Sequence, residues 1–170
     1  MRALSDKAAR HKIHIRTLRG AYAQGNRLRT YNVVTSFIVK EGRILILRRS
    51  DRVGSYRGKW SAVSGYLEDD PLSQAYREIR EELSIPGEDL KLMAAGDPTE
   101  VSDKNLGVRW IVHPFLFEFT GEDSKINLNW ESLEVKWVRP EEVRQLETVP
   151  DLYRILSDLW VRAYPSKTIR

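Results

Sequence analysis

One segment of the chain, LEDDPLSQAYREIREELSIPG, restricts the fold more than any other because it predicts a single helix with both ends marked. Asp70 is a good N-cap residue, and Pro71 suits the first helical position. Pro86 and Gly87 close the segment, since neither continues a helix readily. We therefore expect a helix over about residues 71–83.

The side chains of this helix divide into an apolar stripe and an acidic face. The apolar residues recur at steps of three and four, as one buried stripe requires: Leu72, Ala75, Ile79 and Leu83. Glu78, Glu81 and Glu82 lie at i, i+3 and i+4, which predicts that they project from one face, roughly opposite the stripe. Like charges four residues apart repel by about 0.2–0.5 kcal/mol, and a bound divalent cation would reverse that penalty.

A helix face with acids and arginines is most often only solvated, so the preceding residues matter. Residues 60–64 alternate like a short strand that leads into Gly65. A glycine there would let a backbone carbonyl approach an ion on the acidic face. Arg77 stands four residues before Glu81 and can pair with it, which would keep that carboxylate ionised. With oxygen ligands only, the expected ion is Mg²⁺ or Mn²⁺.

The rest of the chain predicts several strands and few helices. Strands are expected at residues 31–40, 43–49, 60–64, 89–96, 108–119 and 133–138. The first two flank Glu41-Gly42, which indicates a hairpin, and Pro114 implies an edge strand or a bulge. Pro140 and Pro150 each open a predicted helix. This order favours an α/β (α+β) fold, in which a mixed sheet is flanked by helices.

Charge divides the chain unevenly. Residues 1–30 hold eight of the 28 basic residues and one of the 24 acidic ones, so we interpret them as a basic N-terminal extension. A domain over residues 31–163 and a short tail, residues 164–170, would follow. Cysteine is absent, which excludes disulfides and thiolate metal sites. No apolar run suits a membrane span or a signal peptide, so we expect a cytoplasmic protein without a membrane partner.

The segment VSGYLEDDPLSQAYREIREELSI resembles the Nudix box, whose pattern is G-x5-E-x7-R-E-U-x-E-E-x-G-U with U a bulky aliphatic residue. Gly65 supplies the first glycine, and residues 77–85 match the remainder except at Ser84. Asp69 replaces the first glutamate, and the stretch between Gly65 and Arg77 is two residues shorter. Glycine normally ends this helix in a left-handed conformation, so Ser84 predicts a different helix end.

The resemblance implies the family's α/β/α sandwich and Mg²⁺-dependent hydrolysis, with Mn²⁺ as the alternative, of a nucleoside diphosphate linked to another moiety. Glu78 and Glu82 match the usual metal ligands, and the Gly65 carbonyl would complete the shell. Glu81 would bind a further ion or help to activate water. Arg77 would orient the carboxylates.

Other residues are weaker candidates. Glu131 and Glu134 could supply a general base from outside the box, although an alternating strand favours Glu134 as merely an outward residue. His113 is better interpreted as a packed strand residue. Candidate platforms for a base, most of them expected to pack in the core, are Tyr56, Trp60, Trp110 and Trp130. Arg52 and Arg57 could meet phosphates, but exposed loop arginines usually have no specific role.

The sequence leaves two alternative functions and the oligomeric state to be considered. A silent Nudix-fold module would bind RNA or a protein partner through the basic residues 1–30, although a solvated or packed arm is favoured over RNA binding. An isomerase of the isopentenyl diphosphate type is disfavoured because the chain lacks the cysteine of its acid–base chemistry. The resemblance also allows a homodimer.

Overall fold

The computed structural model describes residues 28–166 and 169. Within them the strands are β1 (Arg29–Lys40), β2 (Arg43–Arg49), β3 (Trp60–Ser61), β4 (Val63–Tyr66), β5 (Leu90–Ala95), β6 (Thr99–Asp103), β7 (Val108–Phe119) and β8 (Ser132–Val138). The α-helices are α2 (Pro71–Leu83) and α3 (Leu152–Ala163), and the 3-10 helices are η2 (Gly87–Asp89), η3 (Asp123–Lys125) and η4 (Pro140–Gln145). The predicted basic extension lies outside the described residues as far as residue 27.

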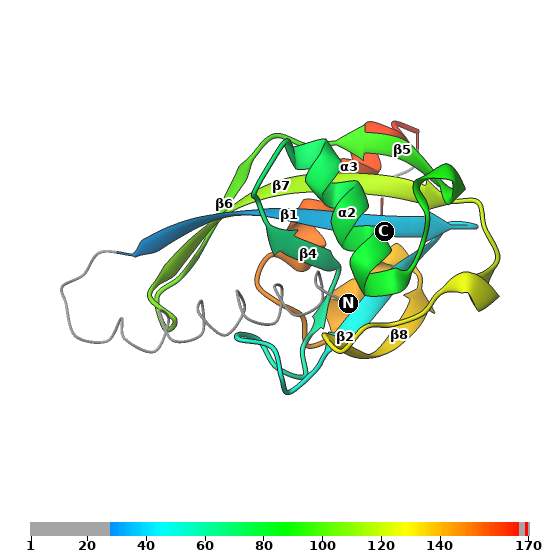
Figure 1. Ribbon diagram of the computed structural model, residues 1–170. Helices are drawn as coiled ribbons and strands as arrows, with labels where there is room; N and C mark the ends of the chain where they lie inside the picture. Colours follow the sequence, from blue (N-terminus) through cyan, green and yellow to red (C-terminus); the bar gives the residue numbers. More distant parts are fainter. Residues whose placement is uncertain (1–27, 167–168, 170) are drawn as a thin grey trace.

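Two 12-residue strands, β1 and β7, run parallel and form the axis of one mixed sheet (Figure 1). Along β1, β4 pairs with the middle of the strand and β2 with its end, both antiparallel. Along β7, β6 pairs with the first half and β5 with the second. β3 and β8 pair with β2. Each long strand therefore changes its antiparallel neighbour along its length.

Pro114 lies at one of these changes. The prediction was an edge strand or a bulge: β7 is not an edge strand, and the irregularity in its pairing with β5 lies between Leu92 and Ala94 rather than at Pro114. In β7, Val112 pairs with Thr99 of β6, whereas Phe115 pairs with Ala95 of β5. Between them, the Pro114 carbonyl accepts a hydrogen bond from the Gly96 N–H at 2.9 Å. Because the N and O atoms of one strand residue point to the same side, the missing N–H faces the β5–β6 connection rather than β1.

The predicted hairpin is confirmed. Lys40 pairs with Arg43, so Glu41 and Gly42 are the two turn residues, at φ 50° and 74°. Positive φ at both positions is the turn geometry that matches the twist of two antiparallel strands, and Gly42 reaches it without a steric cost.

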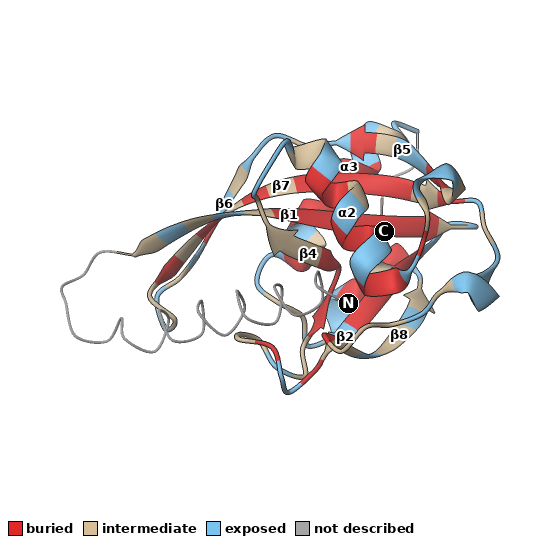
Figure 2. Ribbon diagram, in the orientation of Figure 1, coloured by how far each residue is buried: buried red, intermediate tan, exposed pale blue. Residues whose placement is uncertain are grey.

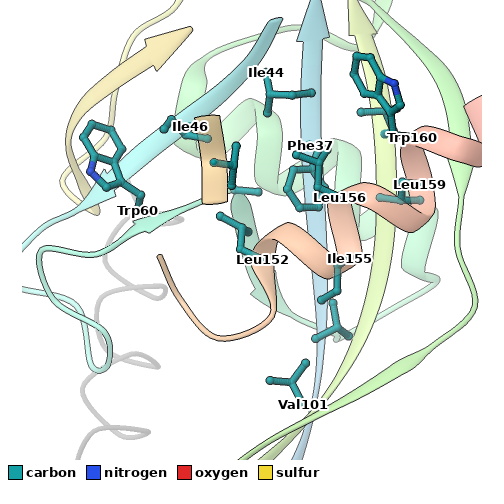
Figure 3. Packing of buried hydrophobic residues seen from close by; sticks show 14 of the residues in the cluster. Phe37, Ile44, Ile46, Trp60, Val101, Leu152, Ile155, Leu156, Leu159 and Trp160 are labelled. Carbon is teal, nitrogen blue, oxygen red and sulfur yellow. The ribbon is translucent and has the colours of Figure 1, made fainter. Parts of the chain in front are cut away.

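Helix α2 covers one face of the sheet and α3 the other (Figure 1). Alternation along β2 serves both faces: Leu45 and Leu47 join the apolar cluster under α2, whereas Ile44 and Ile46 join the cluster under α3. Buried residues accordingly concentrate along the middle of the sheet and on the inner helix faces (Figure 2). Figure 3 shows how α3 packs on its side. The predicted α/β/α arrangement is confirmed.

Smaller elements differ from expectation. The polar strand β6 was not predicted. The helix at Pro140 is the 3-10 helix η4, and α3 begins at Leu152, two residues after Pro150. No helix in the described part of the chain is long and apolar enough to cross a membrane.

Candidate metal and active site

Helix α2 has the predicted bounds. The Asp70 carboxylate accepts a hydrogen bond from the Ser73 N–H at 2.9 Å, and this bond lowers the pKa of Asp70. At the other end Ser84 has φ 60° and ψ 18°, and its N–H donates to the Arg80 carbonyl. The expectation of a different helix end was wrong: serine adopts the left-handed conformation, which costs a residue with a Cβ about 1–2 kcal/mol.

The segment after η3 crosses the C-terminal end of α2. The Asn127 N–H donates to the Leu83 carbonyl at 2.9 Å, and the Asn129 N–H donates to the Glu82 carbonyl at 3.1 Å. These bonds satisfy carbonyls that a helix end leaves without an internal partner. They also hold the segment that leads from Asn129 to Glu131 beside the last turn of α2. Glu131 is buried, with 8% of its surface exposed.

The acidic residues of α2 do not share one exposed face. Glu78 and Glu82 are buried, at 4% and 5% exposure, whereas Glu81 is exposed. With 3.6 residues per turn, Glu82 lies beside Ala75 and Ile79, on the flank of the apolar stripe rather than opposite it. Packing of the stripe against the sheet therefore buries Glu78 and Glu82 and leaves Glu81 in solvent.

Strand β4 receives the two buried carboxylates. A Cβ atom at Gly65 would lie 2.1 Å from Cδ and Oε1 of Glu78, so only glycine fits there. The neighbouring Ser64 N–H donates to Oε1 of Glu82 at 3.2 Å. Glycine was predicted here to let its carbonyl approach a metal. The structure adds a second reason, because the missing side chain makes room for Glu78.

A chain of polar contacts fixes Glu78 from the other side. Its Oε1 accepts a hydrogen bond from Nε2 of Gln74 at 2.8 Å, and Oε1 of Gln74 accepts one from Nη1 of Arg77 at 3.3 Å. Nη2 of Arg77 pairs with Asp69 at 3.4 Å. The predicted pair of Arg77 with Glu81 was wrong, since Arg77 bonds to Asp69 and Gln74. Gln74 was missed, although it stands four residues before Glu78.

Arg49, at the end of β2, was also missed. Its Nε–H donates to the Ser55 carbonyl at 3.0 Å. Burial lowers the pKa of Arg49, and the negative charges of Glu82 and Glu131 oppose that shift, so all three groups lie near one another. The sequence pattern could have identified Arg49. It follows Leu45 and Leu47 at steps of two, and residues at that spacing share one face of a strand, here the face that α2 covers.

Of the two proposed bases outside the helix, Glu131 is near this site and Glu134 is not. The Glu131 carbonyl accepts a hydrogen bond from the Ser50 N–H at 2.8 Å, which places it next to Arg49. Glu134 pairs with Arg48 across β2 and β8 at 3.2 Å, with both side chains exposed. Glu134 is therefore an outward strand residue, as favoured.

His113 and the loop arginines have other partners. Nε2 of His113 lies 3.3 Å from Oδ1 of Asn32, and burial lowers the pKa of His113. Nε of Arg57 donates to the Val53 carbonyl at 3.0 Å. The guanidinium of Arg52 lies over the Trp130 ring, 5.6 Å from its centroid. Trp60 and Trp110 are buried in the cluster under α3.

The predicted ligands, three glutamate carboxylates and the Gly65 carbonyl, are of the type that a hard divalent cation prefers. They are not arranged around one point in this structure. Carboxylate and carbonyl oxygens are the ligands that Mg²⁺ and Mn²⁺ prefer. Among residues 28–166 and 169, no three acidic or histidine side chains lie in an arrangement that could hold a metal ion. Glu78 and Glu82 are instead held by Gln74 and Ser64. The metal-ligand assignment therefore stays a prediction.

Comparison with known proteins extends the likeness over most of the chain. The family model described as NUDIX domain matches residues 29–159. No curated protein matches the chain.

Several solved structures share the fold. A bifunctional NMN adenylyltransferase/ADP ribose pyrophosphatase from Francisella tularensis, complexed with AMP and a Mn ion, has a TM-score of 0.69 at 21% identity. The match covers 90% of this chain and 47% of that one, so this chain spans about half of the Francisella protein. The MutT protein from Methanosarcina mazei Go1 gives a TM-score of 0.62 at 24% identity. That match covers 84% of this chain and 100% of the Methanosarcina protein.

A third likeness is to the dihydroneopterin triphosphate pyrophosphohydrolase of E. coli, with a TM-score of 0.65 at 20% identity. The match covers 81% of this chain and 100% of the E. coli protein. At these identities the likenesses show the fold alone.

Proposed function

Since the chain belongs to the Nudix family, we propose that it is a Mg²⁺-dependent hydrolase that cleaves the pyrophosphate linkage of a nucleoside diphosphate joined to another moiety. One observation carries this proposal: Glu78 and Glu82 are buried against β4, where Gly65 leaves the space for them. Burying a carboxylate costs free energy that an apolar side chain of similar size would not cost, so packing alone gives no reason to place two of them here. A divalent ion would give the pair a function and would add to the hydrogen bonds that Ser64 and Gln74 already donate.

Glu78, Glu82, Glu81 and the Gly65 carbonyl would hold Mg²⁺, or Mn²⁺ as the alternative. When bound, such an ion neutralises charge on the phosphate bridge and makes an attacking water more acidic. The buried pair carries the main ligands, because its orientation is already restricted. Glu81, which is exposed on the same helix, would reach a further ion or the attacking water.

The remaining residues act on this set. Arg77 orients Glu78 through Gln74, with both hydrogen bonds in place. Glu81 and Glu131 are the two candidates for the general base, and Glu131 gains support from its burial beside Arg49. Arg49 places a positive charge next to the carboxylates, where the phosphates of a substrate would lie.

The test is product release from a panel of nucleotides with Mg²⁺. The panel contains a nucleoside triphosphate, ADP-ribose, a dinucleoside polyphosphate and a capped RNA. We expect Mg²⁺-dependent cleavage of at least one of them and a loss of kcat/KM of roughly 100- to 1000-fold in Glu82→Gln. Glu134→Gln, a surface glutamate substitution, is the matched control and should leave kcat/KM unchanged. A wild-type protein that cleaves no member would refute the proposal.

A silent Nudix-fold module is the alternative, and the basic charge of residues 1–30 supports it. It predicts RNA or protein binding that Glu82→Gln leaves intact and that falls steeply with salt. A homodimer and a cytoplasmic location stay predictions from the sequence.

A further inference from the structure

Asn129 lies between the end of α2 and Glu131, and the proposed chemistry gives it no role. Its backbone N–H donates to the Glu82 carbonyl at 3.1 Å, which attaches it to the turn of α2 that carries a predicted metal ligand. Its side chain binds Glu131 twice: Oδ1 accepts a hydrogen bond from the Glu131 N–H at 2.8 Å, and Nδ2 donates to Oε1 of Glu131 at 3.4 Å. One half-buried residue therefore joins α2 to a buried carboxylate.

The two side-chain bonds of Asn129 place different demands on the residue type. A side-chain oxygen that accepts from the N–H two residues further on makes a local turn, and aspartate makes that turn as well as asparagine does. The bond from Nδ2 requires an amide, because aspartate has no donor there and would put a second carboxylate beside that of Glu131. The turn alone does not require asparagine, whereas the contact with the carboxylate does.

The backbone around Glu131 is also held from the end of β2. The Glu131 carbonyl accepts a hydrogen bond from the Ser50 N–H at 2.8 Å, and the Trp130 carbonyl accepts one from Nη2 of Arg52 at 3.4 Å. With its N–H bound to Asn129 and its carbonyl bound to Ser50, Glu131 has a fixed main chain, and its freedom lies in the side-chain torsions. The Asn129 amide restricts those torsions because it binds the carboxylate itself.

We propose that Asn129 is a positioning residue, whose side-chain amide orients the Glu131 carboxylate so that Glu131, rather than Glu81, acts as the general base. This inference rests on the proposed function. Because Asn129 also binds the Glu82 carbonyl, it fixes the base relative to a predicted metal ligand. A general base must reach the water that it deprotonates, so an error in its orientation slows the chemical step without weakening substrate binding. The 3.4 Å contact is long for a hydrogen bond, and catalytic contacts often shorten when substrate binds.

Steady-state kinetics with a nucleotide that the protein cleaves test the proposal. Asn129→Asp and Asn129→Ser both keep an oxygen that can accept from the Glu131 N–H, but neither has the amide donor. We expect each variant to lower kcat about 10- to 100-fold and to change KM less than about twofold. The urea denaturation midpoint of both variants should stay close to that of the wild type, because the turn is kept.

Asn127→Asp is the matched control. Asn127 crosses the same helix end, where its N–H donates to the Leu83 carbonyl, but its Nδ2 donates to the Lys125 carbonyl at 3.1 Å rather than to a carboxylate. This variant adds the same charge to the same segment and should leave kcat unchanged. A loss of kcat that Asn129→Asp shares with Asn127→Asp, and that Asn129→Ser lacks, would come from the added charge and overturns the positioning role.

A double-mutant cycle separates positioning from a general structural effect. Glu131→Gln removes the base and should lower kcat about 100- to 10,000-fold. If Asn129 acts through that carboxylate, then adding Asn129→Ser to Glu131→Gln should lower kcat by less than about a further twofold. A structural effect would instead appear in full in both backgrounds. Full activity of Glu131→Gln, or a full additional loss in the double variant, overturns the proposal.

A spectroscopic measurement tests the contact without any hydrolysis. The side-chain amide resonances of Asn129 in the ¹H–¹⁵N spectrum of the metal-free protein are assigned by their absence from Asn129→Ser. They should move in Glu131→Gln and stay in place in Glu134→Gln, because only Glu131 accepts a hydrogen bond from that amide. Resonances that do not move in Glu131→Gln overturn the proposal whether or not the protein is active.

The outcomes distinguish this inference from the proposed function. A wild-type protein that cleaves no member of the nucleotide panel refutes the hydrolase. An active wild-type protein whose kcat is unchanged in both Asn129→Asp and Asn129→Ser overturns the positioning role alone. A loss of kcat at constant KM in both variants, absent from Asn127→Asp and from the Glu131→Gln background, supports it.

Discussion

Helices α2 and α3 cover opposite faces of the same sheet and have nearly the same length, 13 and 12 residues, but they bury different chemistry. The buried residues of α3 are all apolar: Leu152, Ile155, Leu156, Leu159 and Trp160. Helix α2 buries three apolar residues and three polar ones: Gln74, Ala75, Glu78, Ile79, Glu82 and Leu83. Helix α3 therefore contributes only apolar side chains to the core, whereas α2 also buries the polar side chains of the candidate site.

The energetic difference between the two faces is large. A fully buried leucine or isoleucine contributes roughly 1.5–3 kcal/mol, whereas a buried carboxylate costs free energy until it finds a partner. Helix α2 keeps its place because Ala75, Ile79 and Leu83 have no exposed surface and both ends are capped. Substitutions on α3 should therefore change intrinsic stability, and substitutions on α2 should change metal-linked stability.

The largest expected effect is on α3. Leu156→Ala removes a side chain with no exposed surface, so the free energy of unfolding should fall by about 2–5 kcal/mol. Urea denaturation monitored by circular dichroism measures this loss. The folded fraction should keep its Mg²⁺-dependent activity. If Leu156→Ala and Glu82→Gln lose equal activity per folded molecule, then α3 does not serve stability alone and the contrast between the two helices fails.

Metal should stabilise the α2 face. At a Mg²⁺ concentration of about 100 times its Kd, ligand linkage adds about 2.7 kcal/mol to the free energy of unfolding of the wild-type protein. Thermal unfolding with and without Mg²⁺ measures the shift. Leu156→Ala should show the same shift from a lower Tm, and Glu82→Gln should show none. Absence of any shift in the wild type would contradict the metal site.

Gly65→Ala tests the close approach of β4 to Glu78. The new methyl group would meet the Glu78 carboxylate at 2.1 Å, so we expect a loss of about 1–3 kcal/mol in the free energy of unfolding and weaker Mg²⁺ binding. Gly65→Ala combined with Glu78→Ala should regain the stability without the metal affinity.

The control for Gly65→Ala is Gly87→Ala. A Cβ at Gly87 would meet only the Tyr76 ring, at 3.7 Å, which is an ordinary contact. Equal stability losses in the two single variants, measured by urea denaturation, would rule out the Glu78 contact as the cause.

The smallest expected effect concerns the end of α2. Ser84→Gly removes the cost of a left-handed serine, but glycine loses more backbone entropy on folding, so we expect a net rise of about 0.5–1 kcal/mol in the free energy of unfolding. Ser73→Gly, within the exposed part of the same helix, should lower it by a similar amount. Chemical denaturation of both variants measures the two signs. A lower stability of Ser84→Gly would contradict the assigned helix end.

The sequence alone determined the elements whose causes lie within a few residues. Asp70, Pro71 and the spacing of the apolar residues were enough to place α2, and Glu41-Gly42 was enough to place the hairpin. Capping and turn geometry are local interactions, so they can be predicted before any tertiary contact is known. The order of strands and helices likewise predicted the class of fold.

Only the tertiary structure decided which of these side chains are buried and which meet one another. Burial of Glu78 and Glu82 but not Glu81 depends on where β4 meets the flank of α2. The burial of Glu131 next to Arg49, and the exposed pair of Glu134 with Arg48, depend on contacts between residues far apart in the chain. Periodicity identifies a face of an element, but the packing of that face against its neighbours determines whether a charge on it meets solvent or a partner.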